Sequence, residues 1–233
     1  QCLKELVPAP PGDEVTAIEY VHGGYQNRSV IGVGWSRKVT FWEDGKEKIQ
    51  EPGRQLSGHA DDILSAALNP PSHLATGSYD GVIIVWNIDS GAIRMKLHVP
   101  DLEKKLLTER AVEKLIFLKQ WNGILASCSA DRCVRFWDII GNRGLCLEVD
   151  TGHRSGETVV VACADPANKY FVTGCSAGYV KTWDISKFQG VKCNTVLEQA
   201  QAMRELCHWR AHDAALTSVE YVSQGEMVVT ASA

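Results

Sequence analysis

Tryptophan recurs along this chain at nearly constant spacing, and this repeat constrains the fold more than any other feature. Four of the seven tryptophans form this repeat, namely Trp42, Trp86, Trp137 and Trp183. They are separated by 44, 51 and 46 positions. An aliphatic residue stands three positions before each of them, and Gly, Ser or Cys stands eight positions before. A repeat of about 45 residues predicts stacked supersecondary units, because each unit must bury its apolar face against a neighbour.

Within each repeat, short β-branched segments flank a tight turn. In the second repeat, residues 74–78 and 82–86 are largely apolar and enclose Tyr79-Asp80-Gly81, which is typical of two strands joined by a hairpin turn. The apolar residues fall on nearly consecutive positions, so both faces of each strand require cover. The sequence therefore predicts an all-β fold in which small antiparallel sheets pack face to face.

A Gly-His or Ala-His pair opens several repeats, and Trp-Asp closes two of them. The opening pairs are Gly58-His59, Gly152-His153 and Ala211-His212, and the closing pairs are Trp137-Asp138 and Trp183-Asp184. This pattern resembles the WD-repeat β-propeller family over almost the whole chain. The resemblance implies a β-propeller of four-stranded antiparallel blades, here with about five WD units of which the last is cut short.

On this basis residues 1–233 form one WD-repeat propeller segment. The approximate bounds of its units are 14–56, 57–100, 110–150, 151–209 and 210–233, the last truncated before its tryptophan. Such rings need about four to eight blades, so we expect the remainder of a longer propeller chain. Two insertions, 101–110 and 195–207, carry apolar residues at helical spacing, which predicts a short amphipathic helix in each.

The second repeat contains four residues that the resemblance assigns to a structural hydrogen-bond network, namely His59, Ser78, Asp80 and Trp86. In that network carboxylate, imidazole, hydroxyl and indole N–H follow one another, so buried polar atoms have partners. A Ser-His-Asp hydrolase is the alternative, but the sequence lacks a nucleophile turn of the G-x-S-x-G type. We assign no catalytic residue and expect no enzyme; an active site at the propeller mouth or in another domain is the alternative.

Two aromatic residues stand beside predicted turns, where the resemblance places one face of the propeller. Trp35 and Tyr79 are therefore candidate partner-binding residues, with Asp62 in the adjacent loop, because exposed aromatic residues commonly anchor interfaces. The alternative is that both rings lie on their own blades. We expect a scaffold that presents rigid loops to partner proteins; a structural element that docks on a filament is the second hypothesis.

Composition narrows the partners and the compartment. Twenty-eight acidic and 24 basic residues give a net charge of −4, which disfavours nucleic acid as a partner. The longest apolar runs have about seven residues, far fewer than the roughly 20 that span a membrane, so no membrane segment is expected. Eight cysteines without a C-x-x-C pair favour reduced thiols in a cytoplasmic protein. No metal or cofactor is expected, because neither a zinc-ligand spacing nor a phosphate-binding motif is present.

One short run carries a narrower resemblance. Gly34-Trp35-Ser36-Arg37-Lys38 is similar to segments of the large axonemal WD-repeat proteins of cilia. That resemblance implies a place in a ciliary or axonemal assembly, with cytoskeletal partners.

Overall fold

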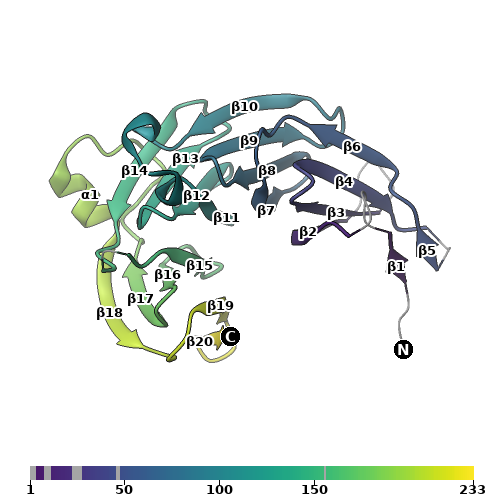
Figure 1. Cartoon of the computed structure of the whole chain (residues 1–233). Helices are drawn as coiled ribbons and strands as arrows, with labels where there is room; N and C mark the ends of the chain where they lie inside the picture. Colours follow the sequence, from purple (N-terminus) through teal and green to yellow (C-terminus); the bar gives the residue numbers. More distant parts are fainter. Residues whose placement is uncertain (1–3, 8–11, 23–27, 46–47, 155) are drawn as a thin grey trace. The chain divides into compact units, whose positions relative to one another are not determined.

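The computed structural model describes residues 4–7, 12–22, 28–45, 48–154 and 156–233. The chain forms two compact units, residues 1–107 and 108–233. In the described residues, each unit holds two four-stranded antiparallel sheets, and the second unit also holds a two-stranded hairpin (Figure 1). We name the four-stranded sheets the first to fourth blades in chain order. The predicted all-β class with four-stranded antiparallel sheets is confirmed.

In the first unit, the second blade is built from four consecutive strands, whereas the first blade leaves out β5. The first blade consists of β2 (Val15–Val21), β3 (Ser29–Gly34), β4 (Lys38–Glu43) and β6 (Arg54–Ser57). The second blade consists of β7 (Ile63–Asn69), β8 (His73–Ser78), β9 (Val82–Asn87) and β10 (Ile93–His98). A short parallel pair is formed by β1 (Glu5–Leu6) and β5 (Ile49–Gln50).

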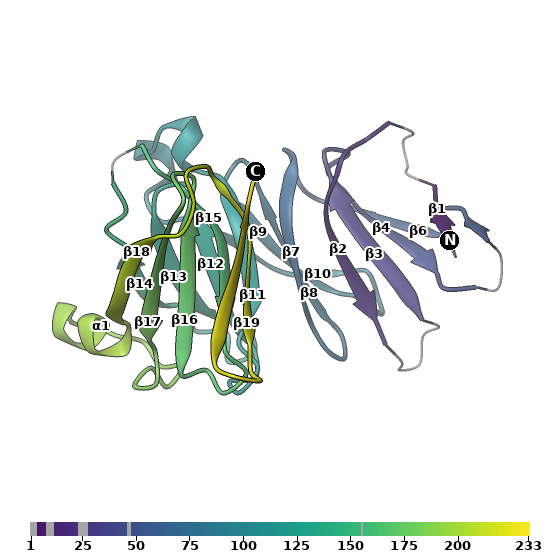
Figure 2. The ribbon, with the colours of Figure 1, turned by 90° about the horizontal axis from the view of Figure 1, so that it is seen from below.

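The second unit repeats this arrangement, and its strands lie in sequence order in each sheet (Figure 2). The third blade consists of β11 (Val112–Phe117), β12 (Ile124–Ser129), β13 (Cys133–Asp138) and β14 (Gly144–Asp150). The fourth blade consists of β15 (Val159–Ala164), β16 (Tyr170–Cys175), β17 (Tyr179–Asp184) and β18 (Arg204–Arg210). The hairpin consists of β19 (Leu216–Val222) and β20 (Met227–Ser232).

The central strands of the blades are covered on both faces, as their continuous apolar runs require. All six residues of β12 are buried, whereas β10 at the edge of its blade alternates between exposed and half-buried positions. The covered faces pack sheet against sheet within each unit. In the first unit Ile31 and Phe41 pack with Leu74, and in the second unit the rings of Phe136 and Phe171 meet edge to face at 5.6 Å.

The repeat is also visible in the backbone. The first strand of each blade, and β19, carries a register shift at its start, between Val15/Ala17, Ile63/Ser65, Val112/Lys114, Val159/Val161 and Leu216/Ser218. The turn between the second and third strands uses a residue with positive φ five positions before each tryptophan: Arg37, Gly81, Arg132 and Gly178. At Gly178 a Cβ atom would lie 2.1 Å from the His212 carbonyl oxygen, so this turn requires glycine.

The two insertions differ from each other. Residues 101–110 contain two 3₁₀ turns, η1 (Leu102–Lys104) and η2 (Leu107–Glu109), and not the predicted amphipathic helix. Both Leu106 and Leu107 are exposed, so the helical spacing there does not mark a buried face. The second insertion contains α1 (Val196–Ala202), which begins at a Thr195 capping box. None of the described helices is long and apolar enough to cross a membrane.

Candidate functional site

Two exposed aromatic residues lie on hairpin turns of the first and second blades. Trp35 directly follows β3 and is 52% exposed, and Tyr79 directly follows β8 and is 41% exposed. Each residue therefore occupies the first position of its turn. About half of each residue is open to solvent, which leaves aromatic surface available to a partner.

Backbone hydrogen bonds fix both turns. Trp35 N donates to the carbonyl oxygen of Glu14 at 3.2 Å, and Tyr79 N donates to that of Asp62 at 2.9 Å. In each case the acceptor is the residue that precedes the first strand of the same blade. The two aromatic side chains thus stand on backbone that is already ordered, which reduces the entropy lost on binding.

Arg37 connects the first-blade turn to the loop that precedes β7. Its Nη1 donates to the Ala60 carbonyl oxygen at 3.1 Å, its Nε lies 3.3 Å from Asp62 Oδ1, and its Nη2 lies 3.8 Å from Asp61 Oδ1. These ion pairs are partly exposed and contribute about 0–1 kcal/mol each. Their main effect is geometric, because they hold the first-blade turn against the second-blade loop. Asp62, a candidate partner-binding residue by sequence, therefore has an intramolecular partner.

In the second blade the hydroxyl that meets the indole belongs to Thr76, and the assignment to Ser78 is corrected. Trp86 Nε1 donates to Thr76 Oγ1 at 2.8 Å, and His59 Nε2 lies 2.7 Å from the same oxygen. Ser78 Oγ is buried without a hydrogen-bond partner among the described residues. The cause is the sheet register, because Leu74 pairs with Trp86 and the indole reaches the diagonal neighbour two residues further along.

Asp80 also differs from the expected network. Its Oδ1 accepts a hydrogen bond from Val82 N at 3.0 Å and so closes the turn, while within the described part of the chain His59 Nδ1 has no partner. Burial lowers the pKa of His59 to about 4, against the opposing charge of Asp80. The histidine is therefore neutral at physiological pH.

The position ten residues before the tryptophan supplies the indole acceptor in the third and fourth blades as well. Trp137 Nε1 donates to Ser127 Oγ at 2.8 Å, and Trp183 Nε1 donates to Thr173 Oγ1 at 3.0 Å. The same position in the second blade is Thr76. The hydroxyl residues at this position could have been found in the sequence. The network expected from the family resemblance instead places the indole acceptor at the position eight residues before the tryptophan.

In the first blade, a backbone carbonyl group accepts the hydrogen bond of the tryptophan indole. Gly32 stands ten residues before Trp42, and a Cβ atom there would lie 2.7 Å from the indole ring. Trp42 Nε1 instead donates to the Val7 carbonyl oxygen at 2.9 Å. The indole of the first blade therefore has a backbone acceptor in place of a side-chain hydroxyl.

The third blade has no histidine at its start and contains a buried arginine. Arg135 is 1% exposed; its Nη1 and Nη2 bind Asp131 at 3.1 and 2.5 Å, and its Nε binds Glu148 at 2.5 Å. Two carboxylates thus balance one buried guanidinium, which is the geometry that a buried charge requires. No pattern in the sequence indicates this pairing, because Arg135 stands in a largely apolar strand.

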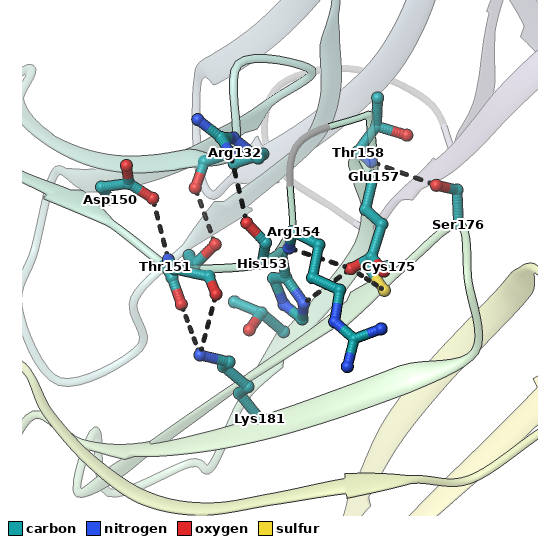
Figure 3. A network of polar contacts seen from close by, with 12 residues as sticks. Arg132, Asp150, Thr151, His153, Arg154, Glu157, Thr158, Cys175, Ser176 and Lys181 are labelled. Carbon is teal, nitrogen blue, oxygen red and sulfur yellow. Dashed lines mark hydrogen bonds and ion pairs between the residues drawn. The ribbon is translucent and has the colours of Figure 1, made fainter.

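In the fourth blade three potential metal ligands lie together (Figure 3). His153, Glu157 and Cys175 place one ligand atom each within 4.8 Å of the others. Cys175 Sγ donates to Glu157 Oε2 at 3.5 Å, and His153 Nδ1 lies 3.9 Å from the same oxygen. His153 is 3% exposed, and neither of its ring nitrogens has a hydrogen-bond partner in the described residues.

Arg154 and Lys181 lie beside this cluster (Figure 3). Arg154 N donates to Glu157 Oε2 at 3.1 Å. Lys181 Nζ lies 2.7 Å from the Thr151 carbonyl oxygen and 2.9 Å from Glu205 Oε2, and both of these partners lie outside the cluster. Burial, and then the charge of Lys181, lower the pKa of His153 to about 4. The imidazole is therefore neutral and able to act as a ligand at physiological pH.

The architecture and the indole contacts together define a class, the repeat proteins built from four-stranded antiparallel blades. Residues 50–87, 119–138 and 144–184 match the family described as "WD domain, G-beta repeat". These matches, together with the relatives below, support the WD-repeat family for this chain.

The chain is similar to insect proteins named WD repeat-containing protein on Y chromosome. It is 22% identical to that of Drosophila pseudoobscura pseudoobscura and 25% identical to that of Drosophila ananassae, with 76% of this chain matched in each case. It is 24% identical to that of Anopheles gambiae over 69% of the chain. The chain spans about a fifth of the length of these relatives, with 21%, 22% and 20% of them covered.

The fold is similar to that in the crystal structure of the computationally designed Ika8 protein. The TM-score is 0.65 at 21% sequence identity, and the match covers 94% of this chain and 55% of that one. At this identity the likeness concerns the fold alone.

Proposed function

We propose that this chain is a non-catalytic scaffold that binds partner proteins through a surface centred on Trp35 and Tyr79. WD repeats generally mediate interactions between proteins. The observation that carries the proposal is the pair of half-exposed aromatic side chains on turns that backbone hydrogen bonds hold in place. Aromatic side chains on ordered backbone are the commonest anchors of protein interfaces.

Arg37 links the two blades that contribute to this surface. Because it binds both the Ala60 carbonyl and Asp62, it ties the turn that carries Trp35 to the second-blade loop. The surface thus combines apolar rings with carboxylates that are partly exposed. It fits a protein segment that offers aliphatic and cationic side chains, which pack on aromatic faces and pair with carboxylates.

The test is quantitative capture of partner proteins on the purified chain. The double variant Trp35→Ala/Tyr79→Ala should weaken binding of the captured partners by about 10- to 100-fold, as expected for two anchor residues. Trp209→Ala is the matched control, since Trp209 is also an exposed tryptophan, 40% accessible, but lies on β18. Equal binding by all three proteins would contradict the proposal.

A ciliary or axonemal location is the finer form of this proposal. It is supported by the run 34–38, which resembles segments of large axonemal WD-repeat proteins such as WD repeat-containing protein 49 and contains both Trp35 and Arg37. In this form the protein is cytoplasmic, and its partners belong to the cytoskeleton of the cilium.

Co-sedimentation with microtubules separates a filament-docking element from an adaptor that binds soluble partners. A filament-docking element should pellet with microtubules and lose this property in the Trp35→Ala/Tyr79→Ala variant. A soluble adaptor should stay in the supernatant while retaining its captured partners. A variant that pellets like the unmodified chain would exclude this surface as the docking site.

A further inference from the structure

The fourth blade contains a polar cluster that the scaffold function does not use. His153, Glu157 and Cys175 come from the loop before β15 and from the end of β16, and they converge on one point (Figure 3). We propose that these three side chains bind a zinc ion. The proposal is independent of the Trp35 surface, which lies on other blades.

The first argument is the unsatisfied histidine. His153 is buried, and in the described structure both of its ring nitrogens lack a hydrogen-bond partner. A buried polar group without a partner costs about 1–3 kcal/mol. His59, the corresponding residue of the second blade, uses one nitrogen to meet Thr76. A metal ion would give His153 the partner that this blade does not otherwise provide.

The second argument is the spacing of the ligand atoms. Tetrahedral zinc binds nitrogen and oxygen at about 2.0–2.2 Å and sulfur at about 2.3 Å, which places neighbouring ligand atoms about 3.4–3.6 Å apart. Here Cys175 Sγ is 3.5 Å from Glu157 Oε2, and His153 Nδ1 is 3.9 Å from that oxygen. The sulfur–oxygen distance already fits, and the nitrogen–oxygen distance exceeds the tetrahedral value by about 0.5 Å. The histidine nitrogen and the sulfur lie within 4.8 Å of each other, so this pair must also draw closer when the ion binds.

The third argument is the chemistry and charge of the donors. A thiolate and an imidazole together favour zinc over magnesium or calcium, which prefer oxygen ligands. One thiolate and one carboxylate neutralise the two charges of the ion, while Lys181 is paired with Glu205. The ion would reach the site beside Glu157, whose side chain is 14% exposed. A water molecule would complete the coordination.

Binding requires that Cys175 lose its proton. Burial raises the pKa of this thiol, whereas the backbone N–H groups of Ala177 and Tyr179 act in the opposite direction. The balanced step is Cys–SH plus Zn²⁺ giving Cys–S⁻–Zn²⁺ plus H⁺. Zinc binding should therefore be accompanied by release of a proton from this thiol.

The experiment measures zinc in the purified chain after dialysis against metal-free buffer. We expect about one ion per chain, and little or none in Cys175→Ala. The control is Cys163→Ala, because Cys163 is also a buried cysteine of this blade, 8% exposed, but lies outside the cluster. Substoichiometric zinc in the unmodified chain, or equal zinc in both variants, would overturn the proposal.

A second readout guards against a variant that fails to fold. Cobalt added to the unmodified chain should give the thiolate charge-transfer absorption and the visible bands of tetrahedral coordination. Glu157→Gln, which alters a partly exposed side chain, should weaken cobalt binding by at least about tenfold while circular dichroism stays unchanged. Cobalt spectra without the thiolate band would show that Cys175 is not a ligand and would sink the proposal.

Discussion

The second and fourth blades begin with a histidine and close on a tryptophan, yet their interiors differ. In the second blade Thr76 meets both the Trp86 indole and His59. In the fourth blade, within the described residues, Thr173 Oγ1 accepts from the Trp183 indole and forms no hydrogen bond with the histidine. His153 lies beside Cys175 and Glu157 instead. Both blades have threonine ten residues before the tryptophan. The different surroundings of the two histidines therefore arise from other residues.

Two substitutions account for this divergence. Cys175 stands eight residues before its tryptophan, where the second blade has Ser78, and Ala177 stands where that blade has Asp80. The strand register is unaffected, because Leu74 and Phe171 pair with their tryptophans in the same way. The two blades therefore share the hydrogen bond between the indole and the hydroxyl ten residues before it, and they differ in the residues that surround the histidine.

The largest expected effect is that of Thr76→Val. This change keeps the shape but orphans two buried groups, the Trp86 N–H and His59 Nε2, and should lower the free energy of unfolding by about 3 kcal/mol. Urea unfolding of the purified chain measures it. A loss below about 1 kcal/mol would show that the shared hydroxyl is not central to the second blade.

Acidification should act on both blades in the same direction. The pKa of His59 and of His153 is about 4 in the folded chain and about 6.5 when unfolded, so the unfolded state binds more protons between these values. Stability is fully present above about pH 6.5 and falls as the pH drops toward 4. Between pH 7 and pH 5 each histidine should remove about 2 kcal/mol.

The measurement for this acid effect is urea unfolding at both pH values, with a chelator present so that metal does not contribute. His59→Gln should remove about half of the pH dependence attributed to the two histidines. His98→Gln is the control, because His98 is exposed on β10. If the exposed control reduces the dependence as much, burial is not the cause.

A smaller loss is expected for Thr173→Val. Only the Trp183 N–H loses its acceptor, so the free energy of unfolding should fall by about 1–2 kcal/mol, less than for Thr76→Val. The same denaturation series gives both values. Equal losses would mean that His59 gains nothing from the second-blade hydroxyl.

The smallest effect is expected for Ser78→Ala. Ser78 Oγ forms no hydrogen bond within the described residues, so its removal should change the free energy of unfolding by less than about 0.5 kcal/mol. A loss as large as that of Thr76→Val would restore the eight-residue column as the indole acceptor.

The sequence predicted what depends on local pattern. Consecutive apolar residues such as those of β9 require a strand that is covered on both faces, and the Tyr79-Asp80-Gly81 segment requires a turn, so class and hairpins followed directly. The choice between Thr76 and Ser78 depends on which cross-strand diagonal the indole reaches, and both residues lie on the same face of β8.

Contacts between segments that are distant in sequence could not be predicted from the sequence. Asp62 and Arg37 meet across two blades, and spacing alone does not pair them. The fourth-blade cluster joins His153 to a cysteine 22 residues further along, a distance that matches no familiar zinc-ligand spacing. Only the hairpin register brings the end of β16 to the loop that precedes β15.

The two arginines at positive φ reveal why the repeats are not interchangeable. Arg37 reaches the Ala60 carbonyl, and Arg132 reaches the His153 carbonyl, so each turn steadies the loop that opens the following blade. Glycine would relax the backbone at these positions by about 1–2 kcal/mol, but it has no side chain to span the gap. A repeat transplanted without the arginine of the preceding turn would therefore lose this contact at its entry loop, even where neighbouring blades cover its strands.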